Sequence, residues 1–102
     1  MRVRDIQILT EAVQDLDTGK RFYDQQQSGI GNYFWDSLLA DIESLLIHAG
    51  VHRAVNGYHR MLAKRFPYAI YYEIVGDVAR VIAILPQRRN PAWLKEQLTQ
   101  RN

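Results

Sequence analysis

The segment from Ile30 to Ala49 has the most regular hydrophobic periodicity in the chain, and it restricts the fold most. Its apolar residues recur at three- and four-residue steps, at Ile30, Phe34, Leu38, Ile42, Leu45, Leu46 and Ala49. This spacing places them on one face of an amphipathic helix. Gly50 follows at the position where helices commonly end in a left-handed conformation. We therefore expect one long helix over 30–49, whose apolar face another layer must cover.

A second helix is expected before it. Residues 10–27 show a looser apolar stripe, and Thr10 is a suitable N-cap. Between the two helices, Gly29 and Gly31 stand among short polar residues, and this group of residues can take the positive φ angles of a helix end and turn. The two helices should form an antiparallel hairpin.

The second half of the chain predicts strands. The segments 58–64, 68–75 and 78–85 are rich in Tyr, Ile and Val, and turn signals at 66–67 and 76–77 separate them. We expect three consecutive antiparallel strands there, after a polar bridge over 51–57. The strand 78–85 is nearly all apolar, so we expect it to lie centrally.

The two ends of the chain complete the expected fold. Residues 2–9 have the β-branched content of a short strand, which we expect to join the other three. Residues 91–98 should form a short helix, because Pro91 suits a first helical position and Asn90 suits an N-cap. The prediction is a single α+β domain over 1–102, with a helical hairpin packed on a mostly antiparallel sheet.

Composition excludes several classes of protein. The chain has 102 residues and no cysteine, which rules out disulfide scaffolds, thiolate metal sites and cysteine nucleophiles. No apolar stretch approaches the roughly 20 residues of a membrane span, and the N-terminal residues lack the apolar core of a signal peptide. We expect a cytoplasmic protein without a membrane association.

The net charge of +2 conceals two opposite halves. Residues 1–48 hold 4 Lys and Arg against 8 Asp and Glu, a net charge of −4, and residues 49–102 hold 9 against 3, a net charge of +6. The basic half could attract nucleic acid or an acidic protein, although a basic surface without a dedicated partner is equally compatible with the pattern.

Three sequence segments together resemble the RelE/ParE toxin superfamily of bacterial toxin–antitoxin and plasmid stabilisation systems. They are Gly29–Phe34 at the start of the long helix, Arg65–Tyr72 with its Phe-Pro-Tyr sequence, and Arg88-Arg89-Asn90-Pro91 followed by Trp93. The resemblance spans nearly the whole chain. It implies growth inhibition by a toxin that a cognate antitoxin protein holds inactive.

The resemblance implies two possible targets. RelE-like members cut messenger RNA on the ribosome without a metal, whereas ParE-like members inhibit DNA gyrase. Metal-free RNA cleavage needs a proton donor or acceptor and fixed cations. The candidate catalytic cations are Arg60, Lys64, Arg88 and Arg89. Period-two geometry would place Arg60 and Lys64 on one strand face.

The expected catalytic set is incomplete. RelE-like members carry a Tyr or His near the C-terminus, and this chain has neither beyond Tyr72. The ParE-like interpretation is therefore slightly favoured, and a non-toxic binding module of the same fold is a third hypothesis. Messenger cleavage would make the chain an endoribonuclease, whereas gyrase inhibition would not make it an enzyme.

Further residues are candidates for binding, each with a structural alternative. Arg65 could bind a partner or merely protect an edge strand, as could Arg60 and Lys64. Tyr71 could stack on a base or serve only packing, and Trp93 could contact a ligand or hold the last helix to the sheet.

The histidines complete the candidates. An unperturbed imidazole is suited to proton transfer, which makes His59 a candidate, and His59 should point away from Arg60 if its strand is regular. His48 and His52 are four residues apart but have no obvious third ligand, so no metal site is expected. The sequence has no Gly-rich phosphate loop, and we expect no small-molecule cofactor.

Overall fold

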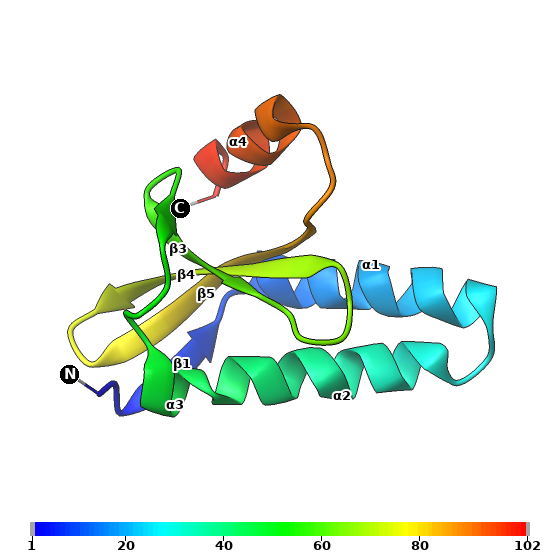
Figure 1. The fold of residues 1–102 in the computed structure, drawn as a ribbon, viewed down its shortest axis with the longest axis horizontal. Helices are drawn as coiled ribbons and strands as arrows, with labels where there is room; N and C mark the ends of the chain where they lie inside the picture. The colour runs from blue at the N-terminus through cyan, green and yellow to red at the C-terminus, as the bar shows by residue number, and fades with distance from the viewer. Residues whose placement is uncertain (1, 102) are drawn as a thin grey trace.

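The computed structural model describes residues 2–101, which form one five-stranded sheet with helices on both faces (Figure 1). The elements are β1 (Asp5–Ile8), α1 (Thr10–Gln26), α2 (Ile30–Glu43), α3 (Leu45–His48), β2 (Ala54–Val55), β3 (Tyr58–Leu62), β4 (Tyr68–Val75), β5 (Val78–Pro86) and α4 (Pro91–Thr99). The predicted α+β class, the helical hairpin and the C-terminal helix are confirmed. No helix within residues 2–101 is long and apolar enough to cross a membrane.

The strands lie in the order β1-β5-β4-β3-β2. β1 pairs with β5 in parallel, and the remaining pairs are antiparallel. The central strand is therefore β4, not β5 as predicted, although β5 is also interior. The polar bridge over 51–57 was predicted without a strand, and this is wrong because it contains β2. Asn56 and Gly57 have φ angles of 53° and 86°, which a two-residue hairpin turn requires.

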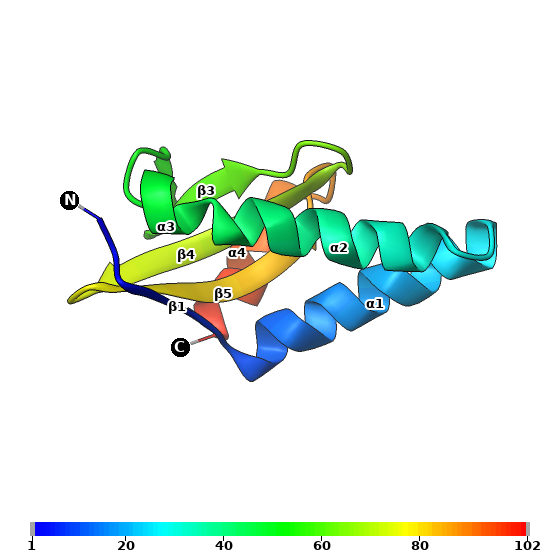
Figure 2. The ribbon, with the colours of Figure 1, turned by 90° about the horizontal axis from the view of Figure 1, so that it is seen from below.

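The two faces of the sheet carry separate apolar clusters. The larger cluster lies under α1 and α2 and joins Phe34 and Leu38 of α2 with Tyr68, Tyr72 and other side chains of β4 and β5. The smaller lies under α4, where Leu94 and Leu98 cover Tyr71 and its neighbours. Figure 2 shows the helical hairpin running along one face and extending past the end of the sheet. Adjacent strand residues thus serve opposite faces, as the pleat requires.

The helical hairpin differs from prediction at the start of α1 and in the first turn of α2. Leu9, not Thr10, is the N-cap residue of α1, because the Leu9 N–H still bonds Val81 of β5 and the helix begins directly afterwards. Gly29 has the expected positive φ of 92°, but Gly31 is helical. Gly31 donates its N–H to the Asp24 carboxylate at 2.8 Å, and a Cβ there would lie 2.5 Å from Asp24 Cγ.

The long helix predicted over 30–49 is interrupted. α2 ends at Glu43 and α3 begins at Leu45. The Ser44 hydroxyl at the break donates to the Asp41 carbonyl at 2.6 Å, and such side-chain bonds compete with the regular helix. Gly50 ends the segment with a φ of 96°, as predicted.

Candidate functional site

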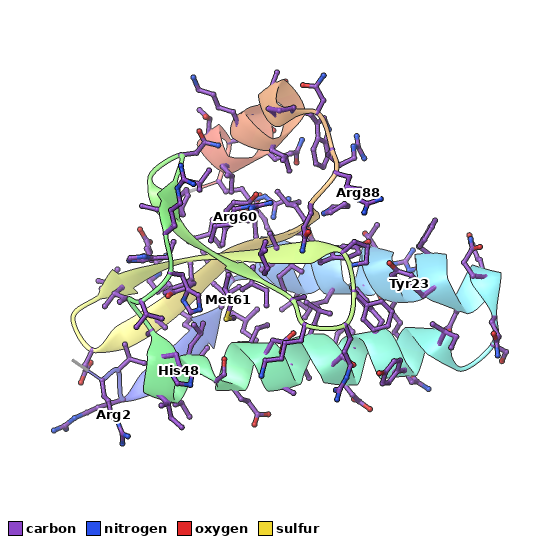
Figure 3. All side chains as sticks on the ribbon, viewed as in Figure 1. Arg2, Tyr23, His48, Arg60, Met61 and Arg88 are labelled. Atoms are coloured by element: carbon purple, nitrogen blue, oxygen red, sulfur yellow. The ribbon has the colours of Figure 1, made fainter. Side chains whose placement is uncertain are left out.

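The α4 face of the sheet holds a small hollow that contains two of the sequence-predicted arginines. We call it the basic hollow, and its volume is about 240 Å³. Its lining residues are Val55, Asn56, Arg60, Tyr71, Gln87, Arg89, Pro91 and Leu94. Arg60 comes from β3, and Arg89 comes from the connection between β5 and α4. Figure 3 shows Arg60 between the sheet and α4, with Met61 on the other side of the sheet.

Arg60 is held in place by Tyr71 of the neighbouring strand. The two residues are paired in the β3–β4 register, and Arg60 Nε donates to Tyr71 Oη at 3.2 Å. Tyr71 is only 1% exposed, so its hydroxyl is fixed by packing. Within residues 2–101, neither Arg60 nor Arg89 forms an ion pair with a carboxylate. The hollow therefore offers two uncompensated guanidinium groups to an anion.

Arg89 is positioned by stacking on α4. Its guanidinium carbon lies 3.8 Å from the centre of the Trp93 ring, close enough for a cation–π interaction. Asn90 caps α4 by accepting the Ala92 N–H at 2.8 Å, and Pro91 begins the helix, as predicted. The Trp93 ring packs against the smaller apolar cluster. Trp93 thus both attaches α4 to the sheet and holds Arg89.

A second and larger cavity lies beside the basic hollow. We call it the aromatic pocket, and its volume is about 370 Å³. Its lining residues are Thr18, Phe22, Tyr23, Pro67, Tyr68, Pro86, Arg88 and Arg89. Burial raises the pKa of the Tyr23 hydroxyl. Burial also raises the pKa of the Tyr68 hydroxyl, and the nearby Tyr23 and Asp15 raise it further. Both phenols thus remain neutral hydrogen-bonding groups.

A third hollow, of about 190 Å³, lies between α1 and α4. Asp15 and Arg101 line it and form an ion pair whose side chains are only 14% and 10% exposed. Asp15 also accepts the Ile84 N–H at 2.9 Å, and Arg101 donates to the Ile82 carbonyl at 3.4 Å. The pair therefore joins α1, β5 and the residues after α4. Arg89 lines this hollow as well, so it borders all three cavities.

Several predicted site residues lie elsewhere. Arg60 and Lys64 were expected on one strand face, and this is wrong because β3 ends at Leu62. The Lys64 N–H donates to Asp41 of α2 at 3.0 Å, and Lys64 lines a different cavity beside α3. Arg65 is exposed in the loop before β4 and lines none of the cavities described here. Arg88 lines the aromatic pocket instead of the basic hollow.

His59 lies on the opposite side of β3 from Arg60, as predicted for a regular strand. Its ring stacks on Tyr72 at a centroid distance of 5.0 Å, and its Nδ1 lies 2.7 Å from the His52 carbonyl oxygen. Tyr72 Oη in turn lies 2.5 Å from His52 Nδ1 and accepts the Gly50 N–H at 2.9 Å. These contacts connect the 50–52 loop to the sheet and use His59 structurally.

The aromatic pocket and the ion pair were not found from the sequence. Phe22 and Tyr23 are adjacent on α1, and neighbours on a helix are about 100° apart, so one of the two had to leave the core stripe. Phe22 is 51% exposed, so the Phe22-Tyr23 pair was a usable sequence signal for an exposed aromatic side chain on α1. Asp15 and Arg101 are 86 residues apart, and no local pattern relates them.

The described part of the chain contains no cluster of three or more His, Cys, Asp or Glu residues that could hold a metal ion. The basic hollow offers arginines, a tyrosine hydroxyl and side-chain amides, and the aromatic pocket offers arginines, hydroxyls and aromatic rings. These groups bind anions and flat or apolar groups.

The fold is similar to that of a chain in the structure "Chromosomal ParDE TA system from P. aeruginosa", with a TM-score of 0.73. The match covers 80% of this chain and 94% of that chain at 15% sequence identity. The sequence matches no protein-family model and no curated protein. At this identity the similarity shows the fold alone: the chain shares the architecture of the matched chain in that ParDE structure.

Proposed function

We propose that the protein is the toxin of a type II toxin–antitoxin pair, and that it acts by binding DNA gyrase. Two observations support the toxin assignment: the similarity to a chain of a ParDE system, and the uncompensated arginines on the α4 face. A surface that presents fixed cations beside aromatic rings is suited to an acidic protein partner.

The residues that line the basic hollow favour gyrase binding over messenger cleavage. Apart from its arginines and the buried Tyr71, the lining residues are apolar or neutral amides and include no His, Lys, Asp or Glu. RNA cleavage needs groups that exchange protons near neutral pH, and an arginine does not. His59 and Lys64 lie away from the hollow. The composition therefore favours binding over catalysis.

Messenger cleavage is the second candidate function because Arg60 and Arg89 would suit the phosphorane intermediate that forms during RNA cleavage. Their guanidinium groups could stabilise the extra negative charge of that intermediate, while the Tyr71 hydroxyl would be the remaining proton donor. A non-toxic binding module would share the same surface without harming cells.

One set of assays separates the three functions. Purified protein is added to a gyrase supercoiling reaction and to a bacterial cell-free translation reaction with primer extension, and growth is measured during expression. We expect inhibited supercoiling with intact messenger. Codon-phased, ribosome-dependent cuts would transfer the assignment to a ribonuclease, and inactivity in all three assays would indicate the binding module.

Variants then test the basic hollow. Arg60→Ala and Arg89→Ala should each reduce gyrase inhibition at least about tenfold, since arginines at the centre of an interface commonly contribute that much. Arg65→Ala removes the same charge outside the cavities and should have no effect. Arg89→Ala and Arg65→Ala should each alter the free energy of unfolding by less than about 0.5 kcal/mol. Arg60→Ala should cost about 1 kcal/mol because the buried Tyr71 hydroxyl loses its partner, and urea titration measures these changes. Full inhibition by Arg60→Ala would exclude the hollow.

The antitoxin would place an acidic, partly extended segment of its own chain on this surface or along the edge of β3. β2 pairs only with Tyr58 and His59, so the edge of β3 from Met61 onward has no strand neighbour among residues 2–101. Leu62 is 53% exposed there, and Val51 nearby is 74% exposed. An open edge beside apolar side chains suits an added strand. Co-purification with a small acidic protein encoded next to the gene tests this assignment.

A further inference from the structure

The aromatic pocket has preformed walls. Phe22 packs its ring edge to face against Tyr23, with 5.1 Å between ring centres. Tyr23 is fixed in turn by contacts with Phe34 and Phe66, whose ring centres lie 5.1 and 4.8 Å away. The volume of the aromatic pocket, about 370 Å³, falls within the range of roughly 300–1,000 Å³ typical of ligand clefts. An incoming apolar group would therefore meet a formed cavity at little cost in ordering.

The rim of this pocket is cationic. Arg88 and Arg89 are both exposed, and within the described chain neither forms an ion pair with a carboxylate. No acidic residue lines the pocket. Carboxylates on an entering segment would complete charge-assisted hydrogen bonds to these guanidinium groups.

The polar groups inside favour a peptide over a nucleotide. Besides the two arginines, the lining offers only the hydroxyls of Thr18, Tyr23 and Tyr68 and no side-chain amide or carboxylate that could read a base edge. The remaining wall is apolar. A bulky apolar side chain flanked by carboxylates matches both the wall and the rim.

Arg89 also borders the basic hollow, where it lies with Arg60. A guanidinium that pairs with a carboxylate at the rim of the aromatic pocket is no longer available to an anion in that hollow. The two cavities therefore share one cation, and occupation of one should weaken the other.

We propose that the aromatic pocket anchors a bulky apolar side chain of an acidic antitoxin segment, and that carboxylates beside this side chain engage Arg88 and withdraw the shared Arg89 from the basic hollow. The inference rests on the proposed toxin function, since that function supplies the acidic partner. Neutralisation then requires no direct covering of Arg60.

The test uses the full chain and a capped peptide, Ala-Glu-Phe-Glu-Ala. The protein carries Trp35→Phe, so that Trp93, on which Arg89 stacks, is the remaining tryptophan. We expect saturable peptide binding that changes Trp93 fluorescence. Phe22→Ala and Arg88→Ala should each weaken binding at least about tenfold. The peptides Ala-Glu-Ala-Glu-Ala and Ala-Gln-Phe-Gln-Ala should also bind the parent protein at least about tenfold more weakly than Ala-Glu-Phe-Glu-Ala does.

Matched controls are available on the same protein. Tyr33→Ala removes another exposed aromatic side chain of the hairpin, and Arg65→Ala removes a charge outside the pocket, so both should bind the peptide normally. Equal binding by Phe22→Ala and the parent protein would overturn the anchor site. Tighter, Phe22-dependent binding of single-stranded oligoadenylate would overturn the peptide assignment.

A competition experiment tests the shared arginine. Inorganic phosphate should shift the NMR signal of the Arg60 Nε–H, and saturating peptide should reduce the phosphate affinity several-fold. Unchanged phosphate affinity would overturn the shared-arginine mechanism. Peptide binding by a protein that inhibits neither gyrase nor growth would instead refute the proposed function and leave the anchor site intact.

Discussion

The two faces of the sheet differ in how completely their helices cover them. Among the described residues, the cluster under α1 and α2 contains 15 buried apolar side chains, and the cluster under α4 contains 7. The basic hollow lies on the α4 face and the third hollow lies between α1 and α4, while the cavity lined by Lys64 lies at the edge of the hairpin face beside α3. The comparison indicates that the hairpin face supplies most of the stability, whereas the smaller cover by α4 leaves Arg60 and Arg89 lining an open hollow.

The largest expected effect comes from a truncation in the hairpin face. Phe34 is fully buried against Tyr68 and other aromatic side chains, and Phe34→Ala should lower the free energy of unfolding by about 3–5 kcal/mol. Urea denaturation measures this loss. Tyr33→Ala, at a neighbouring position that is 49% exposed, should cost less than about 1 kcal/mol. Similar losses for the two variants would contradict the assigned importance of the hairpin face.

A smaller and more local effect should follow from breaking the ion pair under α4. Asp15→Ala leaves Arg101 and the Ile84 N–H without their partner, at a cost of about 3 kcal/mol for a nearly buried pair. Because the pair fixes the end of α4, amide exchange in α4 should accelerate far more than exchange in α2. Asp17→Ala breaks an exposed pair with Arg21 and should cost about 0.5 kcal/mol or less. Equal acceleration in α2 and α4 would show that the two faces unfold together.

The smallest expected effect is a pH dependence confined to the edge of the hairpin face. Burial lowers the pKa of His52 below its usual value of 6.5, and the neighbouring His59 and His48 lower it further. Because Tyr72 accepts the Gly50 N–H, its own hydroxyl proton is available to His52 Nδ1, which must be unprotonated to accept it.

The sign of the pH effect follows from that lowered pKa. The unfolded chain binds the His52 proton more readily than the folded chain, so the contribution to stability is complete above pH 6.5 and is lost as the pH falls toward the folded-state pKa. Urea denaturation between pH 7.5 and 5 measures the slope. His52→Gln should reduce it, whereas His48→Gln, at an exposed position, should reduce it less. An unchanged slope in His52→Gln would refute this role.

The sequence predicted the elements whose patterns are local. Periodicity located α1, α2 and the strands β3 to β5, and Asn90 with Pro91 marked the start of α4. β2 was missed because two residues carry too little periodicity, although Asn56-Gly57 is a strong hairpin signal. The interruption at Ser44 was missed because its hydroxyl bond competes with the helix without altering the apolar pattern.

The candidate site was predictable only in part, because a cavity depends on which elements meet. Arg60 and Arg89 were both singled out, yet their common hollow requires the β3–β4 register and the position of α4. Lys64 was misplaced because the strand ends two residues earlier, where the Asp41 carboxylate takes its N–H. The Asp15–Arg101 pair is a tertiary contact that no local spacing reveals.

The 86 residues between Asp15 and Arg101 also order the events of synthesis. A chain made from its N-terminus can pair α1 with α2 early, but Asp15 has no partner until residue 101 has been added. The α4 face, with both Arg60 and Arg89 in position, is therefore completed last. A nascent chain would present no finished α4 face to the cell, and under the proposed function this delay would leave time for an antitoxin to meet the chain first.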